Sequence, residues 1–154
     1  MSASDPHLIL RRAVAGDWAK GHMRLLSQLT ACGEVSADAY AARLEAMARA
    51  GDTYHLLVVE DTSLSGDCIV GSATLVVELK LIHACAAVGH IEDVVVCEGY
   101  RGKSIGVRIM QALHAIAKEK GCYKVMLDCN AENVHFYEKM DYKENSKHMR
   151  LDFH

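Results

Sequence analysis

The stretch "GHIEDVVVCEGYRGKSIGVRIMQAL", residues 89–113, leads from two acidic residues through a β-branched run and a glycine-bearing turn into a helical pattern. Apolar residues recur at spacings of three and four after the turn, which predicts one buried helix face: Ile105, Ile109, Ala112, Leu113 and Ile116. The first turn of such a helix offers unpaired N–H groups and the positive end of the helix dipole. Gly102 and Gly106 permit close approach to the backbone, and Arg101 and Lys103 add positive charge. The stretch therefore indicates either a pyrophosphate site or an ordinary strand-to-helix turn with basic residues.

The composition bounds the class of protein around this stretch. A chain of 154 residues, of which 51% are hydrophobic, suffices for one hydrophobic core, and we expect a single domain over residues 1–154. The net charge of −3 argues against the global basic field of nucleic-acid binders, so no nucleic-acid partner is expected. No apolar run approaches the roughly 20 residues that span a bilayer, so no membrane partner is expected either.

The cysteines and histidines indicate neither a disulfide framework nor a metal site. The six cysteines form no CxxC pair and several lie in apolar runs, which predicts reduced, structural thiols. The nine histidines show no zinc-ligand spacing such as HExxH, so no metal is expected. The N-terminal "MSASDPHLIL" (1–10) lacks the basic and long apolar segments of a signal peptide. Together these features predict a cytoplasmic protein in a reducing compartment.

Strand and helix patterns follow one another along the chain without repeats or a linker. We expect strands over 7–12, 54–61, 68–79, 86–96, 123–129 and from Tyr142 onward. We expect helices over 17–31, 37–50, 103–120 and 131–140, the first two N-capped by Asp17 and Ser36. The turn-rich segment 62–66 predicts a hairpin between the second and third strands. This pattern is typical of one α/β domain.

The turn at 98–106 carries neither of the two commonest phosphate loops, GxxxxGK[ST] and GxGxxG, which argues against a P-loop nucleotidase and a Rossmann dehydrogenase. It resembles instead the R/Q-x-x-G-x-G/A signature of the GNAT superfamily of acyl-CoA N-acyltransferases, at Arg101, Ser104 and Gly106. Three blocks narrow the resemblance to the glucosamine-6-phosphate N-acetyltransferase family: "GHIEDVVV" (89–96), "GCYKVMLDC" (121–129) and "NVHFYEK" (133–139). The match is strongest over 89–142 and weaker in "LRRAVAGD" (10–17), "LTACG" (29–33) and "ELKLIH" (78–83).

The resemblance implies a fold, a reaction and an assembly. The fold would be a single GNAT-type α/β domain with a central mixed, twisted β-sheet flanked by helices. The reaction would transfer the acetyl group of acetyl-CoA, the cosubstrate, to the amine of D-glucosamine 6-phosphate, a step of UDP-N-acetylglucosamine biosynthesis. In the family a second subunit completes the active site, so a homodimer is implied.

Two positions depart from the family pattern. Ser104 stands where the superfamily usually has the first glycine of its signature. We expect it within the first turn of the helix, where serine is tolerated and its hydroxyl can donate to a phosphate. Asp141 replaces a glycine that usually follows the "FYEK" block. We expect Asp141 in the left-handed region at the end of the short helix, which aspartate tolerates better than most residues.

The resemblance aims Tyr137 at the coenzyme A sulfur, although this residue also fits a core aromatic on a short amphipathic helix. A thiol pKa lies about 1.5 units below a phenol pKa, so we expect a hydrogen bond to the developing thiolate rather than full proton transfer. The oxyanion donor is implied on the backbone near Val94. The residues implied for acetyl-CoA binding are Val94, Val95, Val96, Arg101, Gly102, Lys103, Ser104, Ile105, Gly106, Val107, Asn133, Tyr137 and Lys139.

The acids at the start of the stretch point to opposite faces of a regular strand, so Glu92 and Asp93 serve one site in the same way only if a bulge re-aims one of them. The resemblance implies that Glu92 positions or deprotonates the amine, directly or through water, and that Asp93 contacts a sugar hydroxyl. A solvated strand end is the alternative for each. Asp128 is implied near the reacting amine, and otherwise is a helix N-terminal acid. The catalytic set is Tyr137, Glu92 and Asp128. The set for acceptor binding is Thr30, Lys80, His83, Glu92, Asp93, Tyr123 and Lys124.

Two other functions stay open at this point. One is a GNAT acetyltransferase for another small amine or a protein amine, against which a hydroxyl- and phosphate-binding acidic pair argues. The other is a non-catalytic acyl-CoA-binding sensor, against which the presence of Tyr137, Glu92 and Asp128 argues.

Overall fold

Five strands form one mixed sheet in the computed structural model, which describes residues 5–153. They are β1 (Leu8–Arg12), β2 (Tyr54–Asp61), β3 (Ile69–Leu79), β4 (Ala87–Val96) and β5 (Cys122–Met126). Their order in space follows the chain, with antiparallel pairs from β1 to β4 and a parallel pair between β4 and β5. A parallel pair needs a crossover connection, and a helix supplies it here. The predicted α/β class with a mixed sheet is confirmed.

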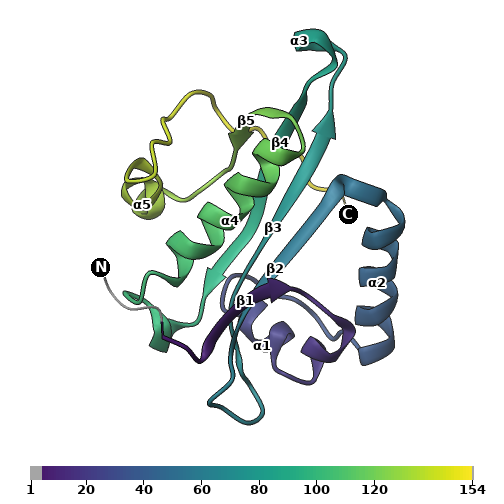
Figure 1. Cartoon of the computed structure of the whole chain (residues 1–154), viewed down its shortest axis with the longest axis vertical. Helices are drawn as coiled ribbons and strands as arrows, with labels where there is room; N and C mark the ends of the chain where they lie inside the picture. The colour runs from purple at the N-terminus through teal and green to yellow at the C-terminus, as the bar shows by residue number, and fades with distance from the viewer. Residues whose placement is uncertain (1–4, 154) are drawn as a thin grey trace.

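Helices flank the sheet on both sides (Figure 1). α4 (Ile105–Glu119) crosses one face over β3 and β4, whereas α1 (His22–Leu26) and α2 (Ala37–Arg49) lie on the other side. The shorter elements are the 3₁₀ turns η1 (Ala15–Trp18), η2 (Gly51–Thr53), η3 (Glu98–Tyr100) and η4 (Ala131–Asn133), and the helices α3 (Ile82–Cys85) and α5 (Val134–Glu138). None of the helices between residues 5 and 153 is long and apolar enough to cross a membrane.

The apolar face of α4 is the centre of the larger hydrophobic core. Ile105, Ile109 and Leu113 are at most 1% exposed and pack with the inward residues of the sheet. Burying such a side chain is worth roughly 1.5–3 kcal/mol, so these contacts hold the helix firmly. Gly71 of β3 lies directly beneath: a Cβ there would stand 2.9 Å from Ile105 Cγ2 and 3.0 Å from Ile109 Cδ1. The missing side chain lets the start of α4 approach the sheet closely.

On the other face of the sheet, a series of buried side-chain hydrogen bonds joins α1 and α2 to β3. The Nδ1 of His22 in α1 lies 2.6 Å from Tyr40 Oη of α2, and its Nε2 lies 2.8 Å from Ser72 Oγ of β3. Burial lowers the pKa of His22 to about 4, so the ring is neutral and its nitrogens divide into one donor and one acceptor. This series of hydrogen bonds therefore fixes both helices against the sheet without a buried charge.

Two helix ends follow the sequence prediction. The N–H of Ala39 donates to Ser36 Oγ at 3.2 Å, which is the predicted N-cap of α2. Gly51, at φ +67°, follows the helix in the left-handed conformation that glycine favours. The hairpin of β2 and β3 is also confirmed.

The first predicted helix, 17–31, is wrong as one element. The chain forms η1 and the five-residue α1 instead, separated by Gly21 at φ +81°. A side chain at Gly21 would collide with Asp67, so this break is built into the packing. Asp17 is not the N-cap of a long helix: it lies inside η1, fully buried, where it accepts hydrogen bonds from the Val14 N–H and from Arg11.

The last predicted strand, from Tyr142 onward, is also wrong within the described residues. The chain after α5 runs to residue 153 without a strand, and β5 ends at Met126 rather than at 129. Apolar residues of the tail alternate with polar ones, yet Met149, Leu151 and Phe153 are 88%, 77% and 90% exposed. The strand pattern is present, but this chain alone provides no surface that covers it.

Candidate functional site

The site begins where β5 leaves β4. The parallel pairing runs from Ala87 opposite Cys122 to His90 opposite Met126, whereas β4 continues to Val96. The β5-facing edge of β4 beyond His90 has no strand partner among the described residues (Figure 1). Such an edge can bind an extended ligand through its main-chain N–H and C=O groups. Val94, Val95 and Val96, implied for cofactor binding, lie on this part of β4.

A β-bulge lies at the acidic pair. Thr74 of β3 faces Glu92, but Ser72 faces Val95, so the two-residue step on β3 corresponds to three residues on β4. Asp93 takes up the extra residue with φ +53°, in the left-handed region that aspartate tolerates better than most residues. The bulge breaks the strict alternation of the strand, and both acids are exposed. The condition under which Glu92 and Asp93 serve one site is therefore met.

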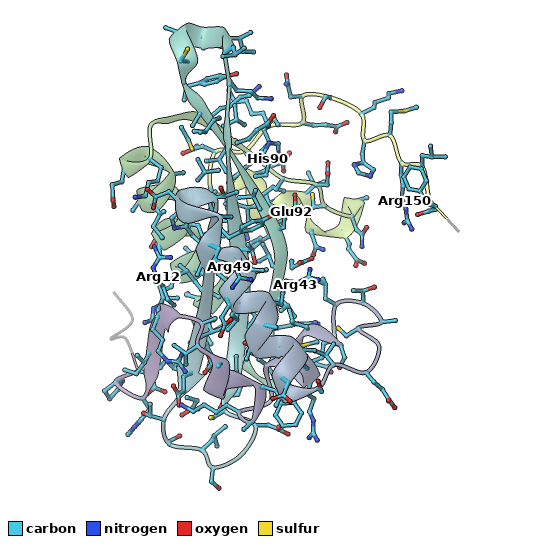
Figure 2. The ribbon with its side chains drawn as sticks, turned by 90° about the vertical axis from the view of Figure 1, so that its right-hand side faces the viewer. Arg12, Arg43, Arg49, His90, Glu92 and Arg150 are labelled. Atoms are coloured by element: carbon cyan, nitrogen blue, oxygen red, sulfur yellow. The ribbon has the colours of Figure 1, made fainter. Side chains whose placement is uncertain are left out.

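The electrostatics join a third acid to this pair. The pKa of Glu92 is raised because its carboxylate loses solvent and because the charges of Asp93 and Asp128 lie near it. The imidazoles of His90 and His148 act in the opposite direction. His90 lies two residues before Glu92 on the same face of the strand (Figure 2), and its Nε2 is 2.7 Å from Glu78 Oε2. A carboxylate in these surroundings is a better proton acceptor near neutrality than an ordinary glutamate.

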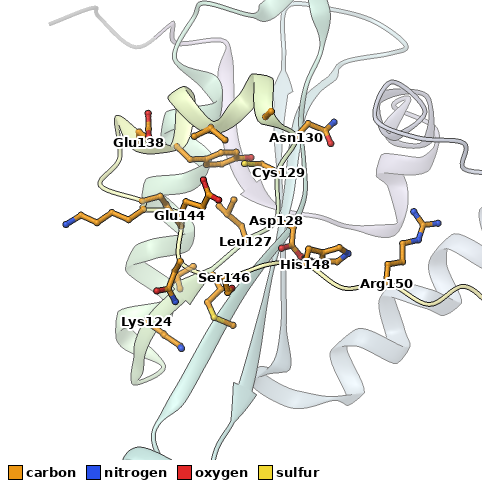
Figure 3. A pocket seen from close by; sticks show the side chains of 18 residues that line it. Lys124, Leu127, Asp128, Cys129, Asn130, Glu138, Glu144, Ser146, His148 and Arg150 are labelled. Carbon is orange, nitrogen blue, oxygen red and sulfur yellow. Dashed lines mark ion pairs between the residues drawn. The ribbon is translucent and has the colours of Figure 1, made fainter.

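A cavity of about 770 Å³ adjoins the acids between β5, α5 and the C-terminal segment (Figure 3). Asp128, Cys129 and Tyr137 are among the residues that line it, and Nδ1 of His148 lies 3.0 Å from Asp128 Oδ2. Asp128 thus links this cavity to the carboxylate of Glu92. The cavity and the acids form one candidate site.

Tyr137 is held within this cavity by aromatic neighbours. Its ring is edge-on to Phe136 and Tyr142, with centroids 5.0 and 5.8 Å apart, and Tyr142 Oη lies 2.7 Å from His114 Nε2. The turn that brings Tyr142 back begins at Asp141, whose φ of +66° confirms the predicted left-handed conformation. Burial, and then the nearby Cys129, raise the pKa of Tyr137. Its phenol is therefore a hydrogen-bond donor at neutral pH.

The glycine-bearing turn lies at the start of α4, and the structure corrects one expectation there. Ser104 is not within the first helical turn but is the N-cap, at φ +60°, and α4 begins at Ile105. This explains why a glycine would suit the position. Gly102, at φ +81°, has no atom near the place of a Cβ, so the backbone is open to a ligand. A Cβ on Gly106 would stand 3.1 Å from Phe136 Cζ, so this glycine also lets α5 pack beside α4.

The residues implied for the sugar phosphate fall into two places. Lys80 forms an ion pair with Glu78, the His83 ring stacks on Tyr123 at 4.2 Å between centroids, and Lys124 Nζ lies 5.4 Å from the same ring. This group lies at the end of the sheet by the β3–β4 connection. Lys124 faces Val88, four residues and therefore about 13 Å along β4 from Glu92.

Thr30 lies elsewhere, in the exposed turn after α1. Gln28 of that turn accepts the N–H of Glu98 at 3.2 Å, so the turn adjoins the end of β4. Asn133 and Lys139 flank α5 and are exposed. No single cluster therefore collects every residue that the resemblance implied.

The sequence interpretation missed two residues of the acid cluster. His90 could have been found from the two-residue period of a strand, because it precedes Glu92 on the same face. His148 carries no such signal, since it comes from an irregular segment 20 residues after Asp128. Among residues 5–153 no group of three potential metal ligands is present.

Comparison with known proteins agrees with this arrangement. Residues 22–142 match the family model of the acetyltransferase (GNAT) family. The chain therefore belongs to this family of acyl-CoA-dependent acetyltransferases. It is 41% identical over 144 residues to probable glucosamine 6-phosphate N-acetyltransferase 2 of Oryza sativa subsp. japonica, covering 94% of this chain and 87% of the relative.

Two further similar proteins carry the same name. Glucosamine 6-phosphate N-acetyltransferase 1 of Dictyostelium discoideum is 37% identical over 150 residues, which cover 97% of this chain and 94% of the relative. The crystal structure of glucosamine-6-phosphate N-acetyltransferase from Arabidopsis thaliana superposes with a TM-score of 0.91 at 35% identity, covering 96% and 99% of the two chains. Within the superfamily, the chain thus falls in the glucosamine 6-phosphate N-acetyltransferase family.

The acid cluster generates a pH prediction. Asp93→Asn should move the acid limb of kcat/KM for the amine acceptor to lower pH. Glu92 accepts a proton only when ionised, and the charge of Asp93 is one cause of its raised pKa. Without that charge the ionised form persists to lower pH, whereas the ionisation of the substrate amine is the same for both enzymes. Comparison of the two pH profiles measures the shift.

The matched control is Glu45→Gln, which removes a carboxylate paired with Arg49 on the exposed face of α2. This variant should not change the pH of the acid limb of kcat/KM. A Glu92→Gln variant that keeps the wild-type limb would show that another group takes the proton.

Proposed function

We propose that this acyltransferase moves the acetyl group of acetyl-CoA to the amine of D-glucosamine 6-phosphate, giving N-acetylglucosamine 6-phosphate and CoA. The observation that carries the proposal is the bulge at Asp93, which sets Glu92 and Asp93 beside Asp128 where β4 and β5 separate. The names of the relatives supply the acceptor. Three carboxylates around one cleft suit an ammonium group and sugar hydroxyls better than a peptide backbone.

The residues present fit acetyl-CoA, which supplies the acetyl group as a thioester. The unpaired edge of β4 over Val94 to Val96 can hold its extended arm through main-chain hydrogen bonds. The open backbone at Gly102 and the first turn of α4 can receive the pyrophosphate, with Arg101 and Lys103 nearby in sequence. Ile105, Gly106 and Val107 carry the N–H groups of that turn.

Bond making and breaking then follow from the side chains around the cleft. Glu92 takes a proton from the ammonium group, directly or through water, so that the neutral nitrogen can attack the thioester carbonyl. The N–H of Val94, just after the bulge, is the proposed donor to the developing oxyanion. As the carbon–sulfur bond breaks, the Tyr137 hydroxyl donates a hydrogen bond to the thiolate, and the second proton, which the acylated nitrogen loses, passes through water to the leaving sulfur to give CoA and the amide. Asp128, paired with His148, holds the acceptor amine, and Asp93 binds a sugar hydroxyl.

We further propose a homodimer. Support comes from two apolar segments that one chain leaves uncovered: the tail with Leu151 and Phe153, and the β3–β4 connection, where Leu79 and Leu81 are 83% and 90% exposed. Exposed large apolar side chains grouped in this way within each segment are typical of protein interfaces. The free edge beside β5 offers a further surface for pairing.

The remaining proposals concern the cellular setting. All six cysteines are free thiols, including the exposed Cys85 and Cys129, which supports a reducing, cytoplasmic location. The product is an N-acetylated amino-sugar phosphate, and we propose that it feeds UDP-N-acetylglucosamine biosynthesis.

The direct test is release of free CoA from acetyl-CoA against a panel of amines. Glucosamine 6-phosphate should exceed glucosamine by roughly two to four orders of magnitude in kcat/KM, because two charge-assisted hydrogen bonds to phosphate contribute about 1.5–3 kcal/mol each. Lys124→Ala should reduce that ratio and leave the acetyl-CoA KM unchanged, whereas Lys118→Ala on α4 should change neither. Equal rates on both sugars would overturn the sugar-phosphate assignment, and no turnover with any amine would favour a sensor.

Tyr137→Phe should lower kcat at least about tenfold, equivalent to about 1.4 kcal/mol of transition-state stabilisation, because the lost hydroxyl acts on the leaving sulfur. The dissociation constant of acetyl-CoA, measured by calorimetry, should stay near the wild-type value since the ring packing persists. Tyr54→Phe, on the exposed end of β2, is the matched control and should be silent. An equal loss of affinity and kcat would make Tyr137 a packing residue.

The assembly is tested by sedimentation of a variant in which Leu151 and Phe153 are both replaced by Asp. The wild type should sediment as a dimer and the variant as a monomer, because two charges would have to be buried in the interface. Leu64→Asp, 45% exposed on the β2–β3 hairpin, introduces a charge at another apolar site and should leave the dimer intact. A wild type that is monomeric at the assay concentration and fully active would refute the homodimer.

A further inference from the structure

The turn before α4 is tied to a distant part of the chain by one side chain. Tyr100, at the end of η3, donates its hydroxyl hydrogen bond to Oδ2 of Asp61, which lies 39 residues earlier at the end of β2. Asp61 is 6% exposed, and Tyr100 is half-buried against the main core. The bond therefore joins the turn to the end of β2, an interior strand of the sheet.

Asp61 is itself fixed. Its Oδ1 accepts the N–H of Ser63 at 2.9 Å and the Ser63 hydroxyl at 2.6 Å, and its own N–H donates to Cys68 O at 2.8 Å. The two hydrogen bonds from Ser63, with that from Tyr100, lower the pKa of Asp61, so it is ionised at neutral pH. Hydrogen bonds to an ionised acceptor are stronger than those between neutral groups. The carboxylate is thus a stationary anchor.

Tyr100 in turn contacts other residues of the turn before α4. Its N–H donates to Cys97 O at 2.8 Å, its carbonyl accepts the N–H of Lys103 at 3.4 Å, and Lys103 Nζ lies 4.7 Å from the centroid of its ring. The next residues, Gly102 and Ser104, are exposed and have positive φ. A non-glycine residue keeps such a conformation only where its surroundings hold it.

We infer that Asp61 and Tyr100 form a strut that positions the turn 98–104, and with it Lys103 and the open backbone of Gly102, for the pyrophosphate of acetyl-CoA. Both are positioning residues: Tyr100 acts through the backbone and Lys103, and Asp61 acts through Tyr100. The inference rests on the proposed function only in that this turn binds acetyl-CoA.

The test is Tyr100→Phe, which removes the hydroxyl and keeps the ring under Lys103. The acetyl-CoA KM and the calorimetric dissociation constant should rise about 10- to 100-fold, the range expected for a lost hydrogen bond to a charged group. The kcat and the acceptor KM should change less than about twofold, since no group at the acids is touched. Asp61→Asn, which retains an acceptor oxygen, should show a smaller loss than Asp61→Ala.

The double variant with Tyr100→Phe and Asp61→Ala should bind acetyl-CoA no more weakly than Asp61→Ala alone, because each change breaks the same bond. Tyr54→Phe is again the control for a tyrosine hydroxyl, and thermal unfolding of Tyr100→Phe checks that the fold persists. A dissociation constant for Tyr100→Phe equal to that of the wild type, or a uniform loss in kcat and both KM values, would overturn the strut alone. A wild type that does not bind acetyl-CoA would overturn the proposed function and this inference together.

Discussion

The close contact of α4 with β3 over Gly71 is the constraint on which the geometry of the site depends. Because no side chain intervenes, Ile105 and Ile109 reach the sheet where Gly71 pairs with Val96, the last residue of β4. The first turn of α4 is thereby placed next to the end of the unpaired strand edge. An extended ligand on that edge would reach the helix N-terminus without any further element. One glycine thus brings together the two features that are proposed to bind the cofactor.

The separation of β5 from β4 leaves main-chain groups of β4 unpaired, and it also brings acidic side chains together. The strand pair stops at His90 opposite Met126, so the main-chain groups of β4 beyond it have no partner on that side within the described chain. Unpaired main-chain groups are stable only where water or a ligand can reach them. The same separation leaves Glu92, Asp93 and Asp128 near one another, and partial burial together with the charges of the other two acids raises the pKa of Glu92. The separation that leaves part of β4 unpaired therefore also groups the acids that include the proposed base.

Much of this could be predicted from the sequence. The spacing of Ile105, Ile109 and Leu113 predicted the buried face of α4, and Ser36 predicted the cap of α2, because both depend on residues that are neighbours in the chain. The left-handed Ser104 was missed because its conformation depends on how the exposed turn 98–104 joins α4, which a serine does not indicate. The break at Gly21 was missed because it depends on packing against Asp67, a residue distant in the sequence.

In the candidate site, too, the sequence indicated individual residues but not the arrangement that depends on distant contacts. The motif blocks indicated Glu92, Asp93, Asp128 and Tyr137, but the bulge that reconciles the acids depends on the register between β3 and β4. A register is set by long-range packing, which no local pattern encodes. His148 reaches Asp128 from an irregular segment, so no periodicity could have placed it. The predicted final strand failed for a related reason: a strand pattern predicts a strand only where a partner edge exists.

The positions of the proposed site residues also bear on how the acceptor would be recognised. The groups proposed for the chemistry, Glu92 and Tyr137, belong to one chain: Tyr137 lines the cavity, and the charge of Asp128 in the same lining acts on Glu92. Lys124, a cation proposed for the sugar phosphate, pairs with Val88, about 13 Å along the sheet from Glu92, so its long side chain would have to extend toward the acids to reach the phosphate of one bound sugar. The proposed acetyl transfer would therefore depend on groups that the bulge at Asp93 brings together, whereas the proposed selection of the phosphate would depend on the reach of a lysine from a different part of the sheet.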